Sequence, residues 1–335
     1  MSELRWNPVL QEWVVTATHR QDRTFLPPAD FCPLCPTKPG GFPTEVPADT
    51  YDVVVFENRF PSLQPAPPPV AVEGTALTPV RPAAGHCEVV LYSPQHGDAL
   101  TTMPLARIRN LAWVWRDRYL ELGASPLVEY VLVFENRGEV VGVTLHHPHG
   151  QIYALPFLPP VPARELAAAR AHRQRTGRCL HCDAVAGELA DGRRIVLEGE
   201  RFVAHVPFAA RYPYETHLVP KAHHPSMAAW DAADVDDLAA VLKGLLVKFD
   251  ALFGKPFPYV MVVHQSPTRG ADPADWHLHF EFYPPMRSAS RLKYVAGVEL
   301  GAGTFVNDTL PEETAAELRR VGPPTVDAVR EEDRR

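Results

Sequence analysis

The chain of 335 residues carries a formal net charge of −7, and 46% of its residues are hydrophobic. This length leaves room for two domains, or one large domain, with a sizeable core. An acidic chain without a long basic run is not expected to bind nucleic acid or an anionic membrane surface. It shows no secretory signal pattern and no stretch approaching the ~20 apolar residues that span a bilayer, so we expect a cytoplasmic protein.

The N-terminal half opens with a Cys-x-x-Cys hook, CPLC, at residues 32–35. A proline-rich run (61–82) is predicted to be a loop, because proline removes amide donors and fixes φ. A helix is predicted over 105–123, where apolar residues recur at three-to-four spacing and a glycine ends the pattern. The other elements are strand-like runs: YDVVVFEN (51–58), EVVLYSPQH (88–96), YVLVFEN (130–136) and LHHPHGQIY (145–153).

The same order of elements recurs in the C-terminal half. A hook, CLHC, is followed by two strand-like runs, a predicted helix, and two more runs of which the last contains His-x-His: 179–182, 194–208, 216–224, 231–254, 259–265 and 277–281. From His147 to His277, and from His149 to His279, the chain advances by the same 130 residues. The repetition predicts a duplicated α+β unit, with an antiparallel sheet and flanking helices in each half. We expect halves at 1–160 and 161–335, with a helix over 164–177 bridging them.

The two hooks indicate metal sites. Five cysteines in a reducing cytosol seldom form disulfides, whereas Cys-x-x-Cys pairs commonly bind zinc. A buried pair of thiols would explain either hook alone, but histidines repeat with the hooks. Neighbouring His146 and His224 remain alternative ligands to His147 and His223. The two predicted tetrahedral sets are Cys32, Cys35, His96 and His147, and Cys179, Cys182, His223 and His277.

His149 is the candidate nucleophile. In an extended segment it shares a face with His147 and Gln151. If His147 binds metal, His149 is available for chemistry, and a neutral imidazole can attack a phosphoryl group to form a covalent intermediate. Gly150 allows a close approach, and Gln151 offers an amide donor to a phosphate oxygen. A lone histidine would more often be a core residue with a satisfied hydrogen bond.

The motif HPHGQ (147–151), with the upstream FEN at 134–136 and the hook, resembles the galactose-1-phosphate uridylyltransferase family, a branch of the histidine-triad superfamily. The resemblance spans nearly the whole chain. It rests further on NPVLQEWVVTATHRQDR (7–23), FENRF (56–60), SPQH (93–96), LHFEFYPPMRSAS (278–290) and KYVAGVEL (293–300).

The resemblance implies that His149 takes UMP from UDP-glucose and passes it to galactose 1-phosphate, with Gln151 holding the phosphate. It further implies a homodimer whose subunits share residues at the active site. Two arginines fit independently, since guanidinium groups bind phosphate oxygens bidentately. The implied nucleotide and phosphate contacts are Arg20, Arg23, Asn58, Asn136 and Thr144, and the implied hexose-phosphate contacts are Lys293 and Glu299.

The sequence also departs from the family pattern. Thr144-Leu145-His146 stands where better-known members have Ser-Asn-Pro, and a late hexose-contacting glutamine has no clear counterpart beyond Asn307. Some members bind iron in the second half through one glutamate and three histidines. The matching residues here include a carboxylate in place of one histidine, so iron is the less favoured metal and two zinc ions are expected: Glu165, His264, His279 and Glu281.

Glu281 stands in the second half where Gln151 stands in the first, and a carboxylate would repel a phosphate there. The first half is therefore expected to be the catalytic one. The alternatives to a uridylyltransferase are an adenylyltransferase or phosphorylase acting on ADP-glucose, a nucleotide-sugar hydrolase, and a zinc-stabilised binding protein without catalysis.

Overall fold

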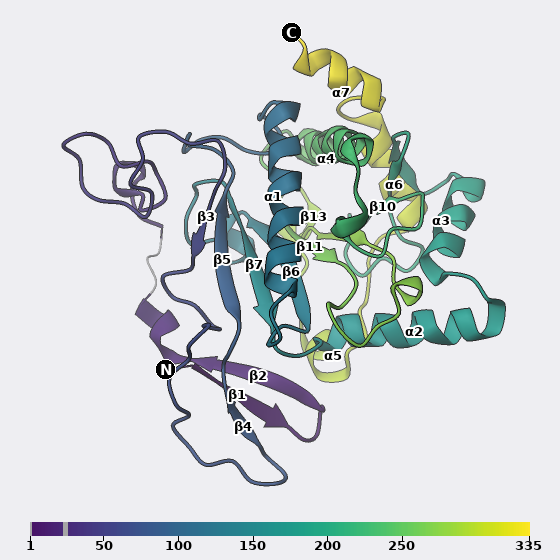
Figure 1. The fold of residues 1–335 in the computed structure, drawn as a ribbon. Helices are drawn as coiled ribbons and strands as arrows, with labels where there is room; N and C mark the ends of the chain where they lie inside the picture. The colour runs from purple at the N-terminus through teal and green to yellow at the C-terminus, as the bar shows by residue number, and fades with distance from the viewer. Residues whose placement is uncertain (1, 23–25) are drawn as a thin grey trace.

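The computed structural model describes residues 2–22 and 26–335 (Figure 1). The strands are β1 (Ser2–Asn7), β2 (Glu12–Ala17), β3 (Val54–Glu57), β4 (Val80–Pro82), β5 (His86–Leu91), β6 (Tyr130–Arg137), β7 (His149–Leu155), β8 (Ile195–Glu198), β9 (Phe202–His205), β10 (Thr216–Pro220), β11 (Tyr259–His264), β12 (His279–Tyr283), β13 (Met286–Ser288) and β14 (Arg291–Leu292). The helices are α1 (Leu105–Gly123), α2 (Pro160–Thr176), α3 (Leu180–Asp191), α4 (Ala232–Phe253), α5 (Gly297–Ala302), α6 (Pro311–Arg320) and α7 (Val326–Asp333).

A nine-stranded sheet runs through the molecule in the order β3-β5-β7-β6-β11-β12-β10-β9-β8. Every neighbouring pair in it is antiparallel. β6 of the first half pairs with β11 of the second, with Val133 opposite Val263. The predicted antiparallel sheets are confirmed, and the two halves join edge to edge into one sheet.

One face of this sheet packs against α1 and α4, which contact each other (Figure 1). The alternation of β7 shows how the strands fit this layer: Ile152 and Ala154 are buried in the core, whereas His149, Gln151 and Tyr153 lie on the opposite face. Because side chains alternate along a strand, a single run supplies both core and site.

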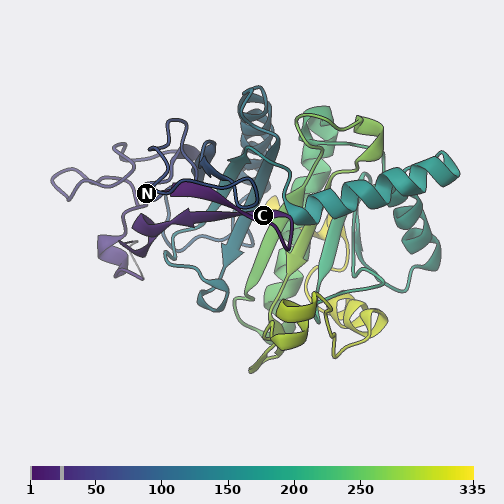
Figure 2. The same ribbon diagram turned by 90° about the horizontal axis from the view of Figure 1, so that it is seen from below.

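Both long helices match their sequence predictions. α1 covers the predicted range, and α4 begins after the N-cap Asp231 and ends before Gly254, which adopts a positive φ of 63°. α2 starts at Pro160, where the two halves were predicted to meet. Its first turns contact the sheet, since Glu165 meets His264 of β11, and its far end reaches beyond the strands in Figure 2. α3 begins inside the second hook, with Cys179 as its N-cap.

A small sheet, β2-β1-β4, lies beside the first half (Figure 2). Its strand β4 corrects the prediction that residues 61–82 form a loop, because Val80–Pro82 pairs with β1. Proline is tolerated there since β4 is an edge strand and needs no donor on its outer side. The predicted single run over 194–208 is likewise a hairpin of β8 and β9.

Trp115 of α1 is fully buried and contacts the rings of Tyr92 and Phe280, one from each half. We expect Trp115→Ala to lower the free energy of unfolding by about 3–5 kcal/mol, because the cavity cannot collapse between two packed halves. Chemical denaturation measures the change. Trp113→Ala on the same helix is the matched control, since Trp113 is 36% exposed; equal losses in both variants would contradict this packing.

Candidate active site and metal centres

His149 is the first residue of β7, between β5 and β6 in the sheet. Its ring nitrogen Nδ1 lies 2.7 Å from the carbonyl oxygen of His147. A carbonyl can only accept, so Nδ1 carries the proton and Nε2 keeps its lone pair. Burial lowers the pKa of His149, so the ring is neutral near pH 7. The tautomer and charge are those of a nucleophile with Nε2 as its reacting atom.

A first pocket lies on one side of His149. It brings together several predicted contacts, and Asn58 Nδ2 donates to Gln151 Oε1 at 3.3 Å. An Arg20 guanidinium nitrogen donates to the carbonyl of Phe60 at 2.9 Å and contacts the Tyr153 hydroxyl at 3.2 Å. The lining residues include both polar and apolar side chains: Arg20, Asn58, Thr144 and Gln151, with Leu34, Phe56 and Val89.

A second pocket shares His149 with the first and contains Asn136. The two pockets therefore bring four of the five predicted nucleotide and phosphate contacts to one imidazole. Arg20, Asn58, Asn136 and Thr144 line the two pockets, whereas Arg23 lies outside the described residues.

Lys293 and Glu299 are not among the described residues that line these two pockets. They bind each other instead, with Lys293 Nζ 3.0 Å from Glu299 Oε1, and the ammonium lowers the pKa of Glu299 to about 2. Lys293 also donates to the carbonyl of Val306. Asn307 donates to the carbonyl of Ala210. The two side chains thus form an ion pair on the second half and do not line the His149 pockets of their own chain.

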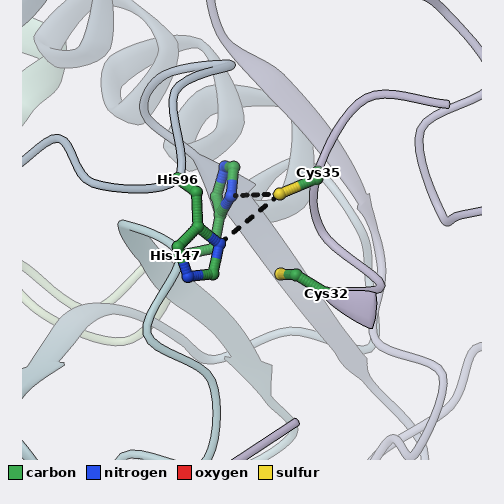
Figure 3. Close-up of side chains that lie close together, drawn as sticks. All are labelled: Cys32, Cys35, His96 and His147. Atoms are coloured by element: carbon green, nitrogen blue, oxygen red, sulfur yellow. Dashed lines mark hydrogen bonds between the residues drawn. The ribbon is translucent and has the colours of Figure 1, made fainter. Parts of the chain in front are cut away.

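The first predicted metal set is assembled (Figure 3). Cys35 Sγ lies 3.4 Å from His96 Nδ1 and 3.5 Å from His147 Nδ1, and Cys32 completes the group. Bonds of about 2.3 Å to sulfur and about 2.0 Å to nitrogen in a tetrahedron place such atoms roughly 3.5 Å apart. The cluster therefore has the dimensions of a closed tetrahedral site.

His147 is oriented by bonds to its other ring nitrogen. Nε2 lies 2.8 Å from the Ser93 carbonyl and 2.9 Å from the Tyr51 hydroxyl, which leaves Nδ1 to face the cysteines. Burial lowers the pKa of His147 to about 4, so the ring is neutral, as a metal ligand must be. Sequence reasoning missed Tyr51 and Ser93. Both lie within motifs that it quoted, but no local pattern signals a bond across 96 residues.

The second set has the same construction. Cys182 Sγ lies 3.4 Å from His277 Nδ1 and 3.6 Å from His223 Nδ1, with Cys179 beside them. His277 Nε2 meets the carbonyl of Pro220 at 3.0 Å, as His147 meets that of Ser93. Of the alternative ligands, His146 contacts Glu139 and His224 contacts Asp234, so neither joins a set.

The iron-type residues also lie together, alongside the second Cys/His set rather than in place of it. His264 Nδ1 is 2.9 Å from both oxygens of Glu165. Glu281 is engaged elsewhere as well: it accepts from Arg211 at 3.2 Å and from the hydroxyl of Tyr283. A cation here would compete with these internal donors.

The chain is a duplicated antiparallel α+β protein with a His-x-His strand and a Cys/His cluster in each half. Two family models match this chain: the N-terminal domain of galactose-1-phosphate uridyl transferase over residues 1–159, and the C-terminal domain of the same family over residues 165–332. The chain belongs to the galactose-1-phosphate uridyl transferase family.

Full-length relatives agree. The galactose-1-phosphate uridylyltransferase of Thermotoga maritima is 41% identical over 95% of this chain and 98% of that protein. A solved uridylyltransferase superposes with a TM-score of 0.83 at 34% identity, covering 98% of this chain and 99% of that one. An ADP-glucose phosphorylase from Arabidopsis thaliana superposes with a TM-score of 0.71 at 25% identity, over 96% of this chain and 99% of that one.

Among the described residues, no helix is long and apolar enough to cross a membrane.

We expect Cys32→Ser to lower the bound metal and the unfolding temperature together, because metal binding contributes directly to folding free energy. Elemental analysis and thermal unfolding of the purified chain measure both. Cys87→Ala is the control, since Cys87 is a buried thiol outside the three clusters. A Cys32→Ser protein with wild-type metal content would exclude this cluster as a metal centre.

Proposed function

We propose that the chain is a UDP-glucose–hexose-1-phosphate uridylyltransferase of cytoplasmic galactose metabolism. It moves UMP from UDP-glucose to galactose 1-phosphate through a uridylyl-His149 and releases glucose 1-phosphate and UDP-galactose. The observation that carries this proposal is the state of His149: its ring is neutral, its Nδ1 donates to a carbonyl, and the residue lines both pockets. The names of its relatives supply the substrates.

The first step is attack of His149 Nε2 on the α-phosphorus of UDP-glucose. The N–P bond forms as the bond from phosphorus to the glucose 1-phosphate oxygen breaks, and the sugar phosphate leaves with that electron pair. The ring becomes cationic, and its Nδ1–H bond to the His147 carbonyl stabilises this charge. In the second step a phosphate oxygen of galactose 1-phosphate attacks the same phosphorus and His149 leaves as a neutral imidazole.

The first pocket supplies the phosphate contacts. Arg20 is oriented by the Phe60 carbonyl and Tyr153, and its guanidinium can bind a phosphate oxygen while keeping these bonds. Gln151 and Asn58 present amides, and Thr144 a hydroxyl. The apolar side chains of Leu34, Phe56 and Val89 would receive the base. Positioned donors of this kind stabilise charge as it develops on the transferred phosphoryl group.

Both Cys/His clusters fit zinc, and we propose one zinc ion in each. Neither would take part in the chemistry, because four protein ligands leave no position for water or substrate. The first would fix His147, whose carbonyl orients the nucleophile. Iron in the Glu165–His264–His279–Glu281 cluster is less favoured because only two of its four ligands are histidines and Glu281 is already bonded.

Lys293 and Glu299 are proposed to bind the hexose phosphate of a partner subunit. They do not line the His149 pockets of their own chain, and a homodimer would bring them to the partner's pocket. Such sharing makes each active site complete only in the dimer.

The second candidate is an enzyme that transfers AMP from ADP-glucose. It is favoured by the superposition on the ADP-glucose phosphorylase. Mixing the protein with UDP-glucose or ADP-glucose, without acceptor, and weighing the intact chain distinguishes the two. A gain of one UMP supports the uridylyltransferase, and a gain of one AMP supports the alternative.

We expect His149→Ala to abolish adduct formation and transfer while leaving the bound metal unchanged, because the alanine variant lacks the nucleophile but retains every ligand in the first cluster. Intact-protein mass spectrometry and elemental analysis of the same sample measure both. Turnover at the wild-type rate by this variant would refute the covalent mechanism.

We expect Gln151→Glu to lower the rate of transfer by roughly 10²–10³-fold, because it replaces a phosphate-binding donor with a like charge. The substitution keeps the shape of the side chain and copies the residue of the second half, Glu281. Gln174→Glu, the same change at an exposed position on α2, is the control. Steady-state kinetics measures both variants; equal rates would remove Gln151 from the site.

A further inference from the structure

A buried carboxyl group lies on β6, the strand that pairs with the strand of His149. Glu135, in the FEN motif of β6, is only 7% exposed, and its Oε1 accepts from the Tyr259 hydroxyl at 3.0 Å. Burial raises the pKa of Glu135 to about 7. Neither the phosphate contacts nor the metal clusters use this group. A carboxyl group held in such a place is costly, so its role needs an explanation.

Tyr92 links this carboxyl group to the nucleophile. Its backbone N–H donates to the Pro148 carbonyl at 3.2 Å, and a Cβ placed on Gly150 would stand only 2.1 Å from its hydroxyl oxygen. One tyrosine therefore contacts the residue before His149 and the residue after it. Glycine at position 150 is what allows the hydroxyl to come so close.

Tyr92 and Glu135 each have one polar atom without a hydrogen-bond partner among the described residues, the Tyr92 hydroxyl and Glu135 Oε2. Both side chains line the second pocket together with His149. The pKa of Tyr92 is raised well above its usual value, first by burial and then by the charge of Glu135, which places the two groups close together. They are the natural partners of one another, directly or through a water in the pocket.

The second half shows that the fold does not need a carboxyl group at the Glu135 position. By continuation of the β6–β7 register, Glu135 lies opposite Gly150. In the second half the counterpart of Glu135 is Val263, and the counterpart of Gly150 is Phe280. These two residues lie opposite each other, and both are fully buried apolar side chains. Phe280 packs against Trp115 and Trp230. The second half thus has apolar side chains at these two positions. The first half, which contains His149, has the carboxyl group of Glu135 and the hydroxyl group of Tyr92 there.

We propose that Glu135 and Tyr92 are positioning residues for His149. Tyr92 contacts Pro148 and Gly150, the residues on either side of His149, and the carboxyl group of Glu135 fixes the direction of the Tyr92 hydroxyl. The pair holds the imidazole so that Nδ1 meets the His147 carbonyl and Nε2 faces the pockets. An effect of the pair on the rate of uridylyl transfer rests on the proposed function, whereas its effect on the orientation of the His149 ring does not.

Three variants test the pair: Glu135→Val, which copies the second half, Tyr92→Phe, and the conservative Glu135→Gln. We expect the first two to slow formation of uridylyl-His149 from UDP-glucose, by up to about 10²-fold, because small misplacements of a reacting group cost this much. The affinity for UDP-glucose and the metal content remain near wild type. Glu135→Gln retains an acceptor for Tyr259 and recovers most of the rate. Single-turnover mass spectrometry and equilibrium binding separate rate from affinity.

The matched control is Tyr119→Phe, which removes a buried hydroxyl that bonds to the Ser266 carbonyl in the same core. It is expected to react at the wild-type rate. Wild-type rates in Glu135→Val and Tyr92→Phe would overturn the proposal, as would parallel losses of rate, affinity and metal, which indicate general loss of structure.

A second measurement does not depend on the reaction. In ¹⁵N-histidine NMR spectra of the full chain, the wild type should show His149 as the Nδ1–H tautomer, and Glu135→Val should broaden or shift this signal while Tyr119→Phe leaves it in place. An unchanged His149 signal in Glu135→Val overturns the positioning role. If wild-type protein forms no adduct with UDP-glucose or ADP-glucose, the proposed function fails, and the NMR comparison still decides the positioning role.

Discussion

The site depends on the placement of His147. Its Nδ1 faces the cysteines of the first metal cluster, its Nε2 bonds to the Ser93 carbonyl, and its own carbonyl accepts from His149. One residue therefore connects the metal centre, the loop after β5 and the nucleophile. The His147 ring is thus held at both of its nitrogens, and the backbone carbonyl of the same residue orients the next imidazole along the strand.

Duplication places two equivalent strands with different side-chain chemistry in one sheet. His149-Gly150-Gln151 and His279-Phe280-Glu281 occupy equivalent strands. In the second half the carboxylate of Glu281 binds Arg211, so the charge is neutralised internally. In the first half Gln151 is neutral and borders an open pocket, where an anion can approach. The same strand position is thus stabilising in one half and receptive in the other.

Much of this arrangement follows from the sequence. α1 and α4 are long and periodic, and the repeated spacing of cysteines and histidines predicts clusters that the structure assembles. The sequence does not reveal the join of β6 with β11, the strand β4, or the hydrogen bonds of Tyr51, because each depends on pairing between distant segments. Local patterns specify elements, whereas tertiary packing decides which of them meet.

The surroundings of His149 also favour transfer over hydrolysis. Water needs a base to remove its proton as it attacks, whereas a phosphate acceptor already carries its negative charge. Among the carboxylates that line the two pockets in the described part of the chain, Glu45 bonds to Arg59 and Asp98 to Ser93. Glu135 bonds to Tyr259 through one oxygen and lies opposite Gly150, on the other face of the sheet from His149. The amides of Gln151 and Asn58 line the first pocket together with His149, and amide groups can donate to a phosphate oxygen but do not take up protons. A site built this way reacts with an acceptor that is ionised before it arrives.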